Sequence, residues 1–200
     1  DALGRSRKAD ESPVLSDSEK SALLDVLHAA MLKEQSPSVL SRILVAMVGL
    51  ESPAAREKLI DGLNQRIALH VENPNLSVLP ELEGLRALYL WSVRIRPSSK
   101  PAPEVPDAFV VQVVKVTYGY MELFAKTLDK NLSTDVVRGD MTANLSHLDA
   151  ILRWGLNVLT PSQKAPADLA SLAASRQWSQ VLVGLDQWKM LLKSAPFNLP

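Results

Sequence analysis

The fold class is decided by residues 107–130, which read DAFVVQVVKVTYGYMELFAKTLDK. Valine is abundant at the start of this stretch, and β-branched residues favour strands. The polar residues nevertheless recur at intervals of three, seven, four and three, namely Gln112, Lys115, Glu122, Lys126 and Asp129. A half-buried strand would instead place a polar residue at every second position. The pattern therefore predicts one long helix with Asp107 at its N-cap.

Two further helical stretches follow this helix. The first runs from about Asp140 to Leu159 and is preceded by a short turn over residues 133–138. The second runs from about Pro166 to Ser194 and is either continuous or broken near Ser175, because its apolar residues recur at alternating spacings of three and four. Residues 107–200 are thus expected to hold three or four helices.

Four helices are expected before the long helix. Ser16 and Glu19 have the spacing of a capping box, which predicts a helix from about Ser18 to Glu34. Ser36-Pro37 and Ser52-Pro53 each suit a helix start, since serine accepts a bond at the N-cap and proline is tolerated at the first helical position. A fourth helix is expected to run from about Ser77–Pro80 to Ile95.

The second of these helices carries apolar residues almost all round from Val39 to Leu50, relieved only by Ser41 and Arg42. Such a pattern is typical of a central helix packed on several sides. We therefore expect it to be the hub of the N-terminal half.

The chain as a whole is predicted to be all-α, with about seven helices and no significant β-sheet. The helices are expected to form a bundle or an irregular α-solenoid with HEAT- or armadillo-like stacking. The expected division is a flexible arm over residues 1–17, a helical half over 18–96, a linker or loop over 97–106 and a second helical half over 107–200. The linker holds four prolines in ten residues, which excludes a helix or a central strand there.

Composition argues against several classes of function and, for nucleic-acid and anionic-membrane binding, lowers the expectation without excluding it. Lysine plus arginine and aspartate plus glutamate both total 22, so the chain lacks the basic excess that nucleic-acid and anionic-membrane binders normally carry. It has no cysteine, which removes thiolate catalysis, disulfides and zinc fingers. No apolar run is long enough for a transmembrane helix. We expect a soluble chain, and the first residue, Asp1, suggests that any targeting signal is absent or removed.

The residues that could carry chemistry do not form a recognisable site. The three histidines, His28, His70 and His147, fall on different predicted helices, and no glycine-rich phosphate loop is present. Glu81 and Glu83 are expected on a solvated first helical turn, where negative charge is favourable. Asp149 and Arg153 stand four residues apart and are expected to pair on an exposed helix surface. We therefore predict no catalytic, cofactor-binding or metal-binding residue and no cofactor.

The fourth helix supplies the candidate partner-binding residues. Its run from Leu88 to Trp91 is too wide for a single core face, so some of these side chains must meet a second layer or a partner. Tryptophan, tyrosine and arginine are enriched at the energetic centres of protein interfaces. The candidates are Tyr89, Trp91, Arg94 and Arg96.

These observations rank three classes of function. The preferred hypothesis is a non-catalytic module for protein–protein interaction, such as a scaffold, an adaptor or a regulatory subunit. The first alternative is an enzyme or small-ligand binder with a pocket between the helical halves. The second alternative is an RNA-binding helical array, because Arg86, Arg94, Arg96 and Lys100 are interleaved with aromatic residues. Neither the partner's identity nor the oligomeric state follows from these patterns.

Overall fold

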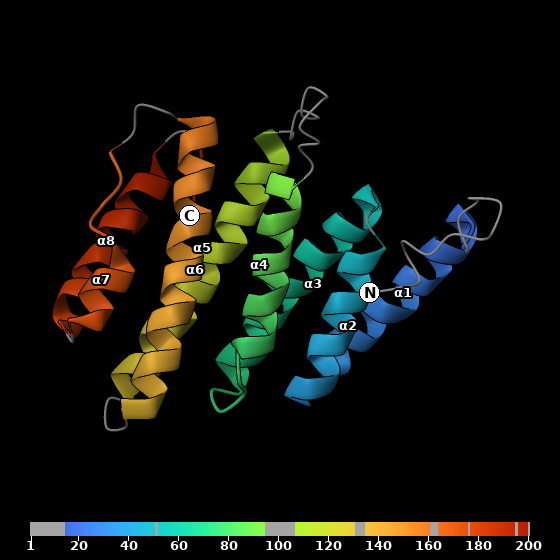
Figure 1. Cartoon of the computed structure of the whole chain (residues 1–200), viewed down its shortest axis with the longest axis horizontal. Coiled ribbons are helices and arrows are strands. Elements are labelled where there is room, and N and C mark those ends of the chain that lie inside the picture. Colours follow the sequence, from blue (N-terminus) through green and yellow to red (C-terminus); the bar gives the residue numbers. More distant parts are fainter. Residues whose placement is uncertain are drawn as a thin grey trace. The chain divides into compact units, whose positions relative to one another are not determined.

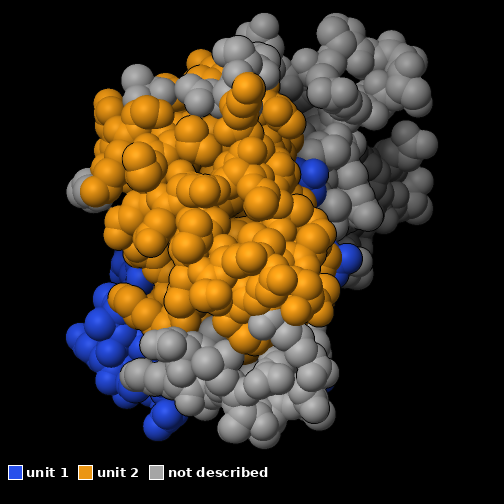
Figure 2. Space-filling model, turned by 90° about the vertical axis from the view of Figure 1, so that its left-hand side faces the viewer, with its two compact units in different colours: residues 1–91 blue, residues 92–200 orange. Residues whose placement is uncertain are grey.

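The computed structural model confirms an all-α protein. The described residues form eight α-helices and no strand (Figure 1). The chain divides into two compact units, residues 1–91 and residues 92–200 (Figure 2). The structure describes residues 15–50, 52–94, 107–130, 135–160, 164–175, 177–194 and 196–199. The predicted arm over residues 1–17 lies mostly outside this set, and the predicted linker over residues 97–106 lies wholly outside it.

The first unit contains four helices: α1 (Asp17–Lys33), α2 (Pro37–Gly49), α3 (Pro53–Glu72) and α4 (Leu79–Arg94), the last of which ends just beyond the unit. The predicted capping box at the start of α1 is present, with the Ser16 side chain accepting from the Glu19 backbone and the Glu19 side chain accepting from the Ser16 backbone. Ser52 caps α3 through a bond from the Ala55 N–H. Ser36 occupies the N-cap of α2 but makes no side-chain capping bond, because its hydroxyl pairs with Ser38 instead.

The core of the first unit lies between α1, α2 and α3, each of which packs against the other two, and α4 adds the buried Leu82, Leu85 and Leu88. Helix α2 packs on α1 and α3, and its Leu44 faces Gly84 of α4, so the prediction of a helix packed on several sides is confirmed but the expectation of packing almost all round it is wrong. The helix buries one stripe, Leu40, Leu44 and Met47, while Val39 and Val45 on other sides are exposed. Apolar residues all round a helix show that each of its faces is able to pack. The number of neighbouring helices decides how many of those faces are buried.

The second unit contains α5 (Asp107–Lys130), α6 (Asp135–Leu159), α7 (Leu169–Ala174) and α8 (Trp178–Lys193). The valine-rich stretch is a helix, as its polar spacing predicted. Four residues connect α5 to α6, and the two helices pack side by side (Figure 1). Helix α8 also packs on α5, and Thr117 and Tyr118 of α5 are buried.

Two predicted boundaries in this unit are wrong. Helix α6 begins at Asp135 rather than Asp140, so Gly139 lies inside it. A glycine there costs only about 1 kcal/mol relative to alanine, which a helix of this length tolerates. The last stretch begins at Leu169 rather than Pro166, because the Asp168 side chain caps the Ala170 N–H and starts α7 there. The expected break falls between α7 and α8, which brings the number of described helices to eight.

Candidate functional site

The predicted partner-binding residues are only partly described. Tyr89 is half-buried on α4. Trp91 and Arg94 belong to the same helix, but their side chains lie outside the described residues, and Arg96 lies outside them altogether. A shared face formed by these four residues therefore stays a prediction.

A buried polar cluster joins α3 to α4 in the first unit. The Arg66 Nε donates to Glu81 Oε1 at 2.8 Å, and His70 Nε2 lies 2.6 Å from the same oxygen. The side chains of Arg66 and His70 are each 2% exposed and that of Glu81 is fully buried. Charge-assisted hydrogen bonds that are shielded from water thus hold α3 and α4 together.

The same arginine also reaches α1. Its Nη1 donates to the backbone oxygens of Met31 at 2.7 Å and Glu34 at 2.8 Å, at the C-terminal end of that helix. The last carbonyls of an α-helix have no partner within the helix and carry partial negative charge. Arg66 therefore fastens the end of α1 to α3 and α4.

The surroundings keep Glu81 ionised. Burial alone would raise the pKa of Glu81, but hydrogen bonds from His70 and Arg66, together with their charges, outweigh it and hold the pKa below its ordinary value. Its second oxygen, Oε2, has no hydrogen-bond partner among the described residues. Every described contact of the carboxylate thus serves to hold helices together.

The expectation that Glu81 lies on a solvated turn is wrong, whereas Glu83 is exposed as predicted. A signal for the buried cluster was nevertheless present in α3. Leu59, Leu63, Arg66 and His70 follow one another at spacings of four, three and four, so the two polar residues continue the apolar stripe of that helix. Polar residues within such a stripe require a buried partner, which Glu81 supplies.

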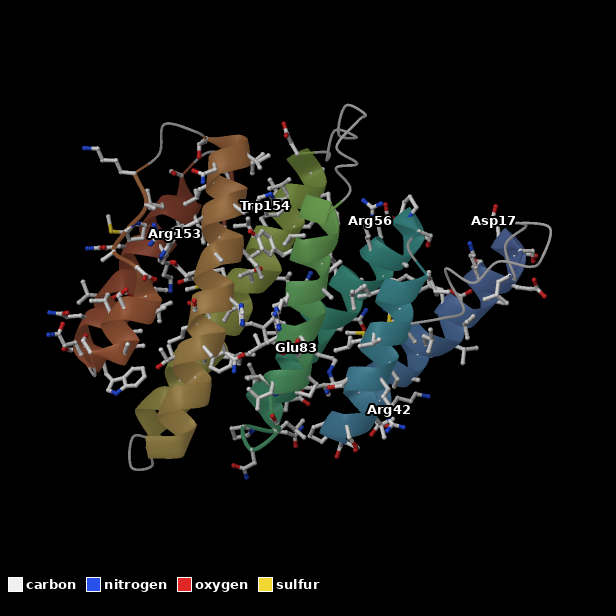
Figure 3. All side chains as sticks on the ribbon, in the orientation of Figure 1. Asp17, Arg42, Arg56, Glu83, Arg153 and Trp154 are labelled. Carbon is white, nitrogen blue, oxygen red and sulfur yellow. The ribbon has the colours of Figure 1, made fainter. Side chains whose placement is uncertain are left out.

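A second polar cluster fastens a loop to α6 in the second unit. The predicted pair is present, since Arg153 Nε donates to Asp149 Oδ2 at 2.7 Å. The pair is not on an exposed surface: Asp149 is buried, and the arginine lies 5.7 Å from the centre of the buried Trp188 ring. Arg153, which is labelled in Figure 3, also donates through Nη2 to the backbone oxygen of Pro166 at 2.8 Å and so fixes the chain before α7.

Asp149 differs from Glu81 in its electrostatics. Burial raises the pKa of Asp149, and the bond and charge from Arg153 offset only part of this rise. The nearby Asp168 carboxylate raises the pKa further. The folded chain therefore holds the Asp149 proton more firmly than the unfolded chain does.

Asp149→Asn is expected to change how stability depends on pH. A carboxyl whose pKa rises on folding stabilises the fold fully below its ordinary pKa, and this contribution is lost as the pH rises through the raised value. The free energy of unfolding of the variant minus that of the wild type should therefore increase from acidic to neutral pH. Urea denaturation at several pH values measures this difference. A difference that decreases from acidic to neutral pH would contradict a pKa of Asp149 that rises on folding.

Two helices present apolar side chains outwards around an exposed charge. On α2 the charge is Arg42 (Figure 3) and on α8 it is Asp186. Neither has an ion-pair partner among the described residues. The exposed apolar side chains are Val39 at 43% and Val45 at 51% on α2, and Leu182 at 43%, Val183 at 55% and Met190 at 74% on α8.

The described residues offer no group of three or more histidine or carboxylate side chains that could hold a metal ion. His28 Nε2 lies 3.2 Å from Asp61 Oδ2, His70 belongs to the cluster around Glu81, and His147 lies on α6. No described helix combines the length and the apolar character needed to cross a bilayer. Comparisons with protein-family models, with curated proteins and with solved structures found no match.

Proposed function

We propose that this chain is a non-catalytic helical module for protein–protein interaction, of the kind found in scaffolds, adaptors and regulatory subunits. The observation that carries the proposal is the pair of outward faces on α2 and α8, where large apolar side chains surround a charge with no partner in the described structure. Apolar surface exposed together in this way is a common mark of an interaction site.

The use of the buried ionisable groups supports the same proposal. Arg66, His70 and Glu81 are bonded to one another and to the end of α1, and Asp149 is bonded to Arg153. A general acid or base must lie within hydrogen-bond distance of the substrate. These buried groups already bond to one another between helices, so they are poorly placed for that role.

Site-specific photo-crosslinking tests the proposal. A benzophenone amino acid is placed at Val45 or Met190, and matched controls carry it at Asn64 on α3 or Ser146 on α6, which are exposed polar positions. In an extract of the source cells, we expect a discrete adduct from the first two positions and none from the controls. Equal labelling at all four positions, or none at any, would count against an interaction module.

A further inference from the structure

The outward faces of α2 and α8 carry opposite charges in matching positions. Arg42 stands midway between Val39 and Val45, three residues from each. Asp186 stands four residues from both Leu182 and Met190. One face is therefore a cation flanked by apolar groups, and the other is an anion flanked by apolar groups.

The dimensions of the two faces also agree. With 3.6 residues per turn, the three α2 residues span an arc of about 120° centred on Arg42, and Leu182, Val183, Asp186 and Met190 span an arc of about 100°. At 1.5 Å per residue, the apolar groups on either side of each charge lie about 9 Å apart on α2 and about 12 Å apart on α8. Two helices packed along these faces would bring the charges together between two apolar contacts.

We infer that the partner of these faces is a second copy of this chain, with α2 of one copy packed against α8 of the next and Arg42 paired with Asp186. The inference rests on the proposed function, since it names the occupant of the same surfaces. Charge complementarity favours a second copy over an unrelated helix, because the same chain carries both the cationic face of α2 and the anionic face of α8. The contact joins two different surfaces, so it is heterologous, and repetition gives a closed ring or an open row of copies.

Sedimentation velocity of the purified chain tests the inference. The wild type should show a mass above that of the monomer that increases with concentration, up to the size of a closed ring or further along an open row. Arg42→Asp and Asp186→Arg each place like charges opposite one another and should raise the dissociation constant by about tenfold or more. Met190→Ser should also weaken association, because it removes the most exposed apolar group of the α8 face.

Mixing the two charge variants gives the sharpest result. In an equimolar mixture of Arg42→Asp and Asp186→Arg chains, each face finds an oppositely charged face on the other variant, so the mixture should associate more strongly than either variant alone. Lys126→Asp and Glu72→Arg are matched controls at exposed positions on α5 and α3, and they should associate as the wild type does. Circular dichroism and melting temperature check that all variants keep the fold.

Each outcome bears on one of the two claims. A wild-type chain that sediments as a monomer at every concentration overturns self-association, as does association that charge reversal leaves intact or that mixing fails to restore. The proposed function survives these results if crosslinking at Val45 and Met190 captures a different protein. It fails if neither self-association nor any position-dependent adduct is found.

Discussion

Replacing Glu81 with glutamine should lower the free energy of unfolding by about 3–5 kcal/mol, because it leaves the buried Arg66 charge without its counterion. The substitution keeps the size of the side chain, so the loss reports charge and hydrogen bonding rather than a cavity. Arg66 and Glu81 are almost completely buried, and water cannot replace the missing carboxylate. Urea denaturation of the purified variant measures the effect.

Glu83→Gln is the matched control, because Glu83 lies two residues away on the same helix and is exposed. Its pairing with Arg86 spans 3.7 Å at the surface and should be worth at most about 1 kcal/mol. Similar losses from Glu81→Gln and Glu83→Gln would show that the buried cluster does not hold the unit together. A double variant, Arg66→Met with Glu81→Gln, should lose less than the sum of the single variants, since no isolated buried charge then remains.

The pH dependence of Glu81→Gln should have the opposite sign to that of Asp149→Asn. The pKa of Glu81 is held below its ordinary value on folding, so its contribution to stability is present above that ordinary value and lost as the pH falls through the lowered one. The deficit of the Glu81→Gln variant should therefore shrink on acidification. The chain thus contains two buried carboxyls whose contributions to stability change with pH in opposite directions.

The fold class was predictable because it depends on patterns within single segments. The spacing of Gln112, Lys115 and Glu122 along α5 distinguished a helix from a strand although valine favours strands. The capping box of α1 was equally local, since Ser16 and Glu19 satisfy each other's neighbouring backbone groups. Such patterns need no knowledge of the rest of the chain.

The burial of Glu81 and the exposure of α2 were not predictable in this way. Glu81 is buried because α3 brings Arg66 and His70 to it across a turn, and nothing in the sequence next to Glu81 indicates that. On α2, Val39 resembles the buried Leu40 in character, and only the arrangement of α1 and α3 decides which of the two is covered. A sequence shows which faces are able to pack but not which of them meet another helix.

Gly155→Ala is expected to destabilise the second unit by about 1–3 kcal/mol, since it forces extra volume between α5 and α6. An added Cβ would overlap the Cγ2 atom of Val114 and lie 3.7 Å from the Cγ1 atom of Val110. Val114 is fully buried and is β-branched, so its side chain has little freedom to rotate away within a helix. The two helices must therefore separate, which outweighs the gain of about 1 kcal/mol in helix propensity from alanine.

Gly84→Ala separates this packing effect from helix propensity. Its Cβ would lie 3.3 Å from Cδ1, 3.5 Å from Cδ2 and 3.7 Å from Cγ of Leu44, all at the far end of a flexible side chain that needs to move by only a few tenths of an ångström, so the variant should be neutral or gain up to about 1 kcal/mol. Val114→Ala in the Gly155→Ala background should recover part of the loss, because it removes the atoms that the new methyl group meets. A Gly155→Ala chain as stable as the wild type in urea would mean that α5 and α6 are not in close contact at this position.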